Sequence, residues 1–65
     1  MKIIVNGDAR DVIAASLGAA LDELGFQDAV VATALNGEFV SAPARGAITL
    51  SDGDRIEVLA PMQGG

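Results

Sequence analysis

The sequence predicts one small α+β domain, in which a single helix covers one face of a mixed β-sheet of four to five strands. Three observations support this class. The chain has 65 residues, which is room for only one core. Its hydrophobic content of 51% is typical of a folded chain. Strand signals lie on both sides of one helical stripe of leucines, and that stripe needs a sheet face to pack against.

Two Asn-Gly pairs predict β-hairpins, because both residues of such a pair tolerate the positive φ that a tight two-residue turn requires. Asn6-Gly7 and Asn36-Gly37 each lie between apolar or alternating residues. The strands predicted around them are Lys2–Val5, Ala9–Val12, Val30–Leu35 and Glu38–Val40.

A final strand is predicted over Asp54–Ala60, after an Asp-Gly turn. Its apolar Ile56 and Val58 alternate with more polar neighbours, which is the period of a strand with one buried face. Residues 47–50 fit either a short strand or a turn. Phe26 and Phe39, the only aromatic residues, are predicted to lie in the core.

One helix is predicted by three leucines at helical spacing, Leu17, Leu21 and Leu24. Ser16 can cap its N-terminus, and Gly25 occupies the usual position of a left-handed residue after a helix. However, Ile13 also falls on the leucine stripe. Periodicity alone therefore slightly favours a helix that begins at Val12, and the start remains open between Val12 and Leu17.

Composition argues against several functions. The chain has no His and no Cys, so it lacks the commonest general base and the commonest thiol nucleophile. Nine acidic residues against four basic ones give a net charge of −5, which disfavours nucleic acid as a partner and favours a basic protein surface. No apolar run is long enough to span a bilayer, and no secretion signal is recognised, so we expect a cytoplasmic protein without membrane contact.

The acidic residues predict no metal site or catalytic pair. The close groupings are Asp8 with Asp11, Asp22 with Glu23, and Asp52 with Asp54. All lie in predicted turns or on the polar helix face, where carboxylates have ordinary capping and solvation roles.

Residues 61–65 are predicted to form a flexible tail that follows a domain of residues 1–60. The strand pattern stops at Pro61, and the sequence finishes with Gly64-Gly65. Glycine has no Cβ atom and adopts any φ, so this pair can enter a channel too narrow for other residues. Five residues reach at most about 17 Å, which is enough to place the ionised carboxylate of Gly65 in another protein's nucleotide pocket.

Taken together, the order of elements resembles the ubiquitin-like β-grasp fold, and the chain is similar to the ThiS family, the sulfur carriers of thiamine (thiazole) biosynthesis. The stretches that carry this likeness are Lys2–Gly7, Ser16–Gly25, Ala32–Glu38 and Asp52–Gly65. The resemblance implies that the first and last strands are parallel neighbours at the centre of the sheet. It also favours Ser16 as the helix cap and a strand over Ala9–Val12.

The resemblance further implies a carrier and not an enzyme. A ubiquitin-activating-type adenylyltransferase (ThiF-like) would use ATP to adenylate the carboxylate of Gly65, so no cofactor would be bound permanently. Sulfur from a donor such as a cysteine desulfurase would then give a thiocarboxylate, and thiazole synthase (ThiG-like) would take that sulfur. Met62, Gln63 and Gly64 would occupy the partner's channel.

Three alternatives remain at this point. They are a sulfur carrier of the type of the molybdopterin synthase small subunit, a ubiquitin-like modifier, and an interaction module with an incidental tail. The outward residues of the last strand, Arg55, Glu57 and Leu59, are the candidate partner face. The family often has a proline directly after the position of Val40, whereas here Pro43 is displaced, so the conformation of residues 41–46 is not predicted.

Overall fold

The computed structural model describes residues 1–60. The tail predicted over residues 61–65 lies outside this described part, so the proposed boundary at residue 60 stays a prediction. The elements are β1 (Lys2–Val5), β2 (Asp8–Asp11), α1 (Leu17–Glu23), β3 (Ala32–Leu35), β4 (Glu38–Val40), the 3-10 helix η1 (Ala42–Ala47) and β5 (Arg55–Leu59).

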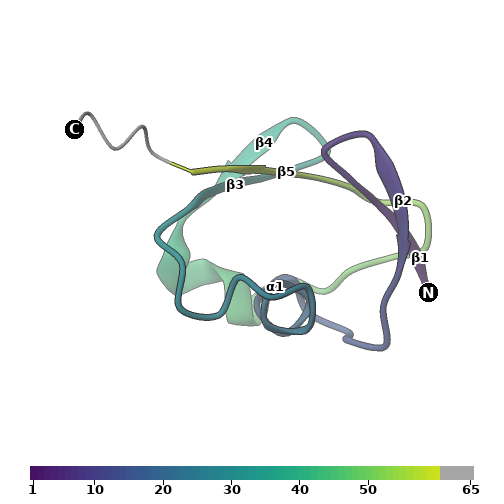
Figure 1. Ribbon diagram of the computed structural model, residues 1–65, viewed down its shortest axis with the longest axis horizontal. Coiled ribbons are helices and arrows are strands. Elements are labelled where there is room, and N and C mark those ends of the chain that lie inside the picture. Colours follow the sequence, from purple (N-terminus) through teal and green to yellow (C-terminus); the bar gives the residue numbers. More distant parts are fainter. Residues whose placement is uncertain (61–65) are drawn as a thin grey trace.

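The strands form one mixed sheet in the order β2-β1-β5-β3-β4. β1 and β5 are parallel neighbours at its centre, paired at Ile4↔Arg55 and Val5↔Ile56, while the other pairs are antiparallel. α1 lies against one face of the sheet (Figure 1). The α+β class, the single helix and the central position of the last strand are therefore confirmed, as is the expected β-grasp arrangement.

Both hairpins form at the Asn-Gly pairs. Asn6 and Asn36 have φ values of 50° and 51°, and the glycine after each has a φ of 88°. Positive φ at both central residues gives the turn whose twist matches that of the flanking strands. β2 occupies residues 8–11, one residue earlier than predicted, and β3 begins at Ala32 instead of Val30.

The helix begins at Leu17, so the start at Val12 that periodicity favours is wrong. Ser16 is the N-cap, and its Oγ accepts a hydrogen bond of 3.1 Å from the backbone N–H of Ala19. Ile13, which shares the helical spacing, is 94% exposed and does not belong to the buried stripe.

The segment between β2 and α1 is held by a carboxylate at the other end of the helix. Glu23 accepts hydrogen bonds of 3.0 Å from the backbone N–H groups of Ile13 and Ala14. The N–H groups of Ile13 and Ala14 therefore donate to a side chain and not to the carbonyls of a helical turn. For this reason Ile13 is not helical, although its spacing from Leu17 and Leu21 fits a helix.

The region after β4 contains two features that the sequence left open. Residues 42–47 form η1, with Pro43 in its first turn, where a proline's missing N–H costs nothing. Thr49 then forms an isolated bridge with Ser16, and the carbonyl of Ile48 accepts from the N–H of Leu17 at 2.9 Å. Residues 47–50 therefore bind the start of α1 without becoming a strand.

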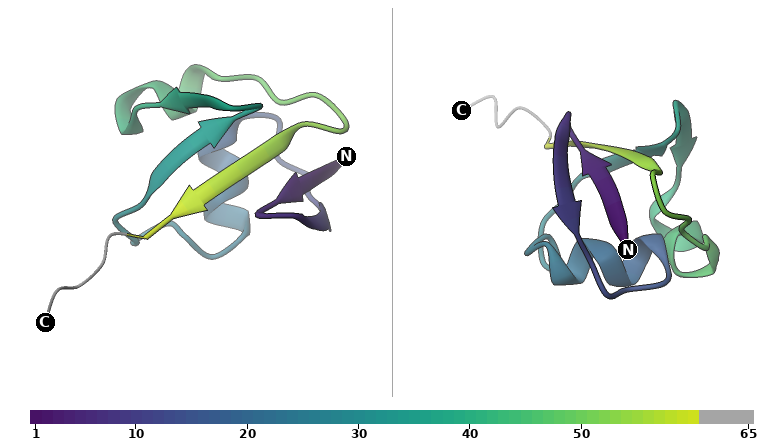
Figure 2. Two further views of the ribbon diagram at one scale, coloured as in Figure 1. Left: turned by 90° about the horizontal axis from the view of Figure 1, so that it is seen from above. Right: turned by 90° about the vertical axis from the view of Figure 1, so that its right-hand side faces the viewer.

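The core lies between α1 and the inner face of the sheet. Figure 2 (left) looks onto the opposite face, with α1 behind the strands. β5 alternates strictly, with Ile56 and Val58 buried and the residues on either side exposed. The buried hydrophobic residues are Ile3, Val5, Val12, Leu17, Ala20, Leu21, Val40, Leu50, Ile56 and Val58.

One polar side chain, Thr33, is buried on the inner face, at 2% exposure. Its hydroxyl donates to the carbonyl of Val40 at 2.9 Å and accepts from Nε of Arg45 at 2.9 Å. A second nitrogen of Arg45 donates to the carbonyl of Val31 at 2.6 Å. This network fastens η1 to both strands of the second hairpin.

Replacing Thr33 with valine removes only this hydroxyl. We expect a loss of about 1–3 kcal/mol in the free energy of unfolding, because Nε of Arg45 loses its acceptor in a partly buried site. Urea unfolding measures the change. Thr49→Val is the matched control, since Thr49 is exposed, and a shift within about 0.5 kcal/mol is expected there. Equal shifts for the two variants would contradict the role assigned to the network.

Candidate functional site

The candidate site is the sheet face that points away from α1, called the outer face below. The structure places Arg55, Glu57 and Leu59 of β5 there, all exposed. The three do not form one cluster, since Arg55 and Leu59 lie at opposite ends of β5, about 13 Å apart at the rise of an extended strand. Leu59 is the one that lies where the strand ends, six residues before Gly65.

Phe39 also lies on the outer face, so its predicted place in the core is wrong. It is 74% exposed, as the register of the second hairpin requires: Phe39 pairs with Ala34, and Ala34 pairs with Glu57 of β5. Phe26 is only partly buried, although it packs against the core.

Leu59 and Phe39 belong to a continuous apolar surface. Ala32 pairs with Leu59, which puts both on this face, and Val30 just before β3 is 81% exposed. We call the following residues the outer patch: Val30, Ala32, Ala34, Phe39 and Leu59. Exposed apolar side chains gathered in this way are typical of a surface that another protein covers.

Two shallow grooves hollow the outer patch and meet at Ala32 and Leu59. One, of about 300 Å³, is lined by Val30, Val31, Ala32, Leu59 and Ala60. The other, of about 130 Å³, is lined by Ala32, Thr33, Ala34, Phe39, Glu57 and Leu59. Both are built almost wholly of apolar atoms, with the carboxylate of Glu57 beside the second, so they fit apolar side chains of a partner better than a polar small molecule.

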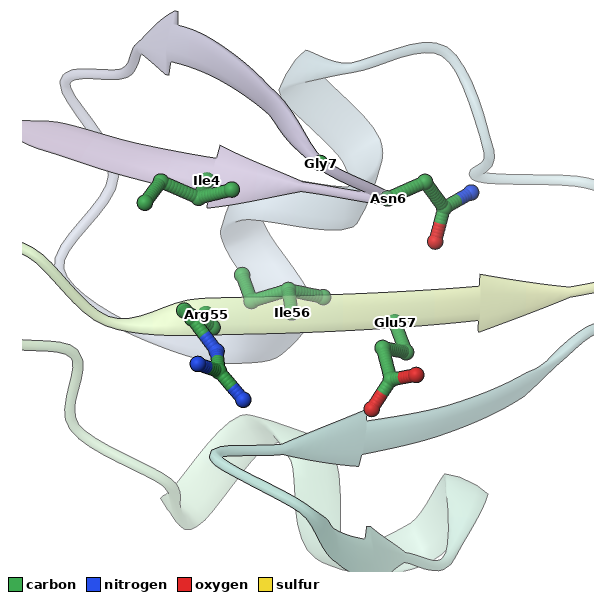
Figure 3. A pocket seen from close by; sticks show the side chains of 6 residues that line it. All are labelled: Ile4, Asn6, Gly7, Arg55, Ile56 and Glu57. Carbon is green, nitrogen blue, oxygen red and sulfur yellow. The ribbon is translucent and has the colours of Figure 1, made fainter.

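The other half of the outer face is more polar. A groove of about 500 Å³ runs between β1 and β5 and is lined by Ile4, Asn6, Gly7, Arg55, Ile56 and Glu57 (Figure 3). Arg55 and Glu57 stand along the β5 side of this groove, with Ile4 on the β1 side. The charged side chains of Arg55 and Glu57 therefore lie along β5, directed toward β3 and away from Ile4 on β1.

The carboxylates in the turns have structural roles. Asp52 accepts from the backbone N–H of Lys2 at 2.7 Å, and Asp54 accepts from the N–H of Ser51 at 2.8 Å. Asp54 also accepts from the amide of Asn36 at 3.1 Å. Within residues 1–60, no group of three or more His, Cys, Asp or Glu residues is placed to hold a metal ion.

Four residues of the outer patch were not predicted as site residues from the sequence: Phe39, Val30, Ala32 and Ala34. The available signal was the hairpin register. A two-residue turn at Asn36-Gly37 forces Ala34 to pair with Phe39, so the two share a face. The alternation of inward and outward residues in β3 was not recognised, because the inward position is occupied by the polar Thr33.

The four site residues predicted within the tail, Met62, Gln63, Gly64 and Gly65, lie outside the described residues. In the described part, no helix combines the length and the apolar character that a membrane crossing would need.

Comparison with known proteins matches residues 3–65 to the ThiS family. The crystal structure of a thiamine biosynthesis protein (ThiS) from Geobacter metallireducens is 39% identical, with a TM-score of 0.80 and full coverage of both chains. A solution structure of a thiamine biosynthesis protein from the same organism is 36% identical, with a TM-score of 0.77, over all of this chain and 88% of that one.

A thiazole synthase from Paramagnetospirillum magneticum is 35% identical over 66 aligned positions. The match covers all of this chain but only 20% of the length of that relative. The family match over nearly the whole chain and the agreement of the two solved structures lead to one conclusion: this chain belongs to the ThiS family.

Proposed function

We propose that this chain is a sulfur carrier of thiamine biosynthesis that works through the carboxylate of Gly65 and is not itself an enzyme. The observation that carries the proposal is the ThiS family match, which extends through Gly64-Gly65. The absence of His and Cys from the sequence agrees with a protein that leaves the chemistry to its partners.

The chemistry has two stages. A carboxylate oxygen of Gly65 attacks the α-phosphorus of ATP on a ubiquitin-activating-type adenylyltransferase, and pyrophosphate leaves. The terminal sulfur of a persulfide, formed by a desulfurase, then attacks the acyl carbon, and AMP leaves with the bonding electron pair. A thiol of the sulfur-transferring partner attacks the inner, partner-bound sulfur of the resulting acyl disulfide, so that a disulfide forms on the partner and the acyl sulfur is released; free sulfide would give the same product directly. The product is a thiocarboxylate, which thiazole synthase consumes. Activation is needed because a free carboxylate is a poor electrophile.

Intact-protein mass spectrometry tests these steps. The chain is incubated with a ThiF-like adenylyltransferase, ATP and sodium sulfide, and the expected product is heavier by the exchange of one oxygen for sulfur. Omitting ATP is the control. An unchanged mass with an adenylyltransferase that converts another ThiS protein would contradict the proposal. An adduct on the lysine of a second protein would indicate a modifier instead.

The outer patch is the proposed docking surface for thiazole synthase. Its apolar grooves lie beside the end of β5, from which the chain continues toward Gly65. The P. magneticum relative supports this choice of partner, because a segment similar to this chain is there part of a thiazole synthase. Glu57 and the net charge of −5 favour a basic rim around the partner's apolar contact.

Phe39→Ser tests this surface. We expect the Kd for a separate thiazole synthase to rise about tenfold or more, because Phe39 is the one aromatic side chain of the outer patch and aromatic side chains buried in an interface often contribute much of its energy. Isothermal titration measures the Kd. Ile13→Ser is the matched control, since Ile13 is also a large exposed apolar residue but lies in the loop between β2 and α1. Binding unaffected by Phe39→Ser, or weakened equally by both changes, would rule the patch out.

A further inference from the structure

We infer that Asn6 is a positioning residue for the carrier reaction: its side-chain amide fixes the end of β5, and with it the point at which the chain leaves the sheet. This inference rests on the proposed function. Its starting point is that the backbone pairing of β1 with β5 stops before β5 does. The last backbone bond between them runs from the N–H of Asn6 to the carbonyl of Ile56, at 2.9 Å.

Beyond that bond, the side-chain amide of Asn6 makes the hydrogen bonds to β5 that the backbone of β1 would otherwise supply. Its Oδ1 accepts from the N–H of Val58 at 2.8 Å, and its Nδ2 donates to the carbonyl of Val58 at 3.1 Å. Both bonds are partly buried. In a continued parallel ladder the backbone carbonyl of residue 6 and the N–H of residue 8 would make this pair of bonds, but the chain at Asn6 has turned away with a φ of 50°. Figure 3 shows the Asn6 side chain directed from the end of β1 toward the last part of β5.

These two bonds hold the last buried residue of β5. Val58 is 6% exposed, while Leu59 and Ala60 after it are exposed. On the opposite side, Leu59 is still paired with Ala32 of β3. Loss of the Asn6 amide would thus leave the end of β5 held from one side only. The chain would then leave the sheet in a wider range of directions, and fewer bound molecules would present the Gly65 carboxylate in line with the α-phosphorus.

The second hairpin provides a matched control. Asn36 has the same turn geometry, and its amide also holds β5, but at the beginning of the strand: Oδ1 accepts from the N–H of Arg55 at 2.9 Å. Asn6→Gly and Asn36→Gly each remove one side-chain amide at a positive φ that glycine adopts without strain. The two substitutions also raise the conformational entropy of the unfolded chain by the same amount. The variants differ in which end of β5 they release.

Two measurements separate positioning from general destabilisation. Hydrogen exchange monitored by NMR should show faster exchange at the Val58 N–H in Asn6→Gly and at the Arg55 N–H in Asn36→Gly. In pyrophosphate release by the adenylyltransferase, Asn6→Gly should lower kcat about tenfold with little change in KM, because the substitution removes one partly buried amide and leaves the exposed side chains available to the enzyme unchanged. Asn36→Gly should leave both constants within about twofold.

Equal loss of kcat in the two variants, or no loss in Asn6→Gly, would overturn the inference. So would unchanged exchange at Val58. If the unaltered chain releases no pyrophosphate at all, the proposed function has failed, and the positioning role fails with it, even where the exchange data show that Asn6 holds Val58.

Discussion

Replacing Gly64 with valine is expected to stop activation of the chain while leaving the domain folded. The side chain of valine adds bulk at the β-carbon and restricts both φ and χ1, so it obstructs a narrow channel and stiffens the segment that must enter it. We expect kcat/KM for pyrophosphate release to fall at least about 100-fold, as when a reacting group is displaced by an ångström.

A graded series makes this result specific. Gly64→Ala adds a single methyl group and should retain part of the activity, so the order should be glycine, alanine, valine. The thermal midpoint should be the same for all three, since the buried hydrophobic residues of the described structure lie between Ile3 and Val58. A valine variant that releases pyrophosphate at the normal rate would show that no narrow channel receives this position.

One extra residue after Gly65 should lower kcat/KM for pyrophosphate release as strongly as Gly64→Val, because it moves the reacting carboxylate.

Leu21→Ala is expected to cost about 2–5 kcal/mol of the free energy of unfolding. Leu21 is 4% exposed and packs with Leu17 and Ala20 in the layer between α1 and the sheet. A domain of this size has a small free energy of unfolding, so such a loss should leave a substantial fraction of the molecules unfolded near 37 °C. Urea unfolding followed by circular dichroism measures the shift.

Ile13→Ala is the control for Leu21→Ala, because both residues share the helical spacing in the sequence. Ile13 is 94% exposed, and its truncation should change the stability by less than about 0.5 kcal/mol. Comparable losses for the two variants would mean that the loop before α1 packs in solution in a way that the structure does not have.

Local chemistry made most of the fold predictable. The Asn-Gly pairs determine both hairpins, because few other residue pairs adopt positive φ twice in succession. The alternation in β5 is equally clear, with Ile56 and Val58 inward. The parallel pairing of β1 with β5 joins residues about 50 positions apart, and no local pattern contains it. The likeness to a family supplied it.

The errors have a common physical cause, which is that burial depends on tertiary partners. Ile13 fits a helical stripe, but Glu23 holds its N–H outside the helix. Phe39 is large and apolar, but the hairpin register turns it outward. Thr33 is polar and yet buried, because Arg45 and the carbonyl of Val40 bind its hydroxyl. For Ile13 and Thr33 a side-chain contact with a residue further along the chain decided the outcome, whereas for Phe39 the backbone register of the hairpin decided it.

The parallel pairing of β1 and β5 has a mechanical consequence. If tension is applied between the N-terminus and the far end of β5, the two central strands are pulled lengthwise in opposite directions. The hydrogen bonds between the two strands are then loaded in shear, so they bear the force together and do not break one after another. A protein that pulls on the end of β5 must therefore break these hydrogen bonds together before the domain unfolds, so we expect the domain to resist a large pulling force.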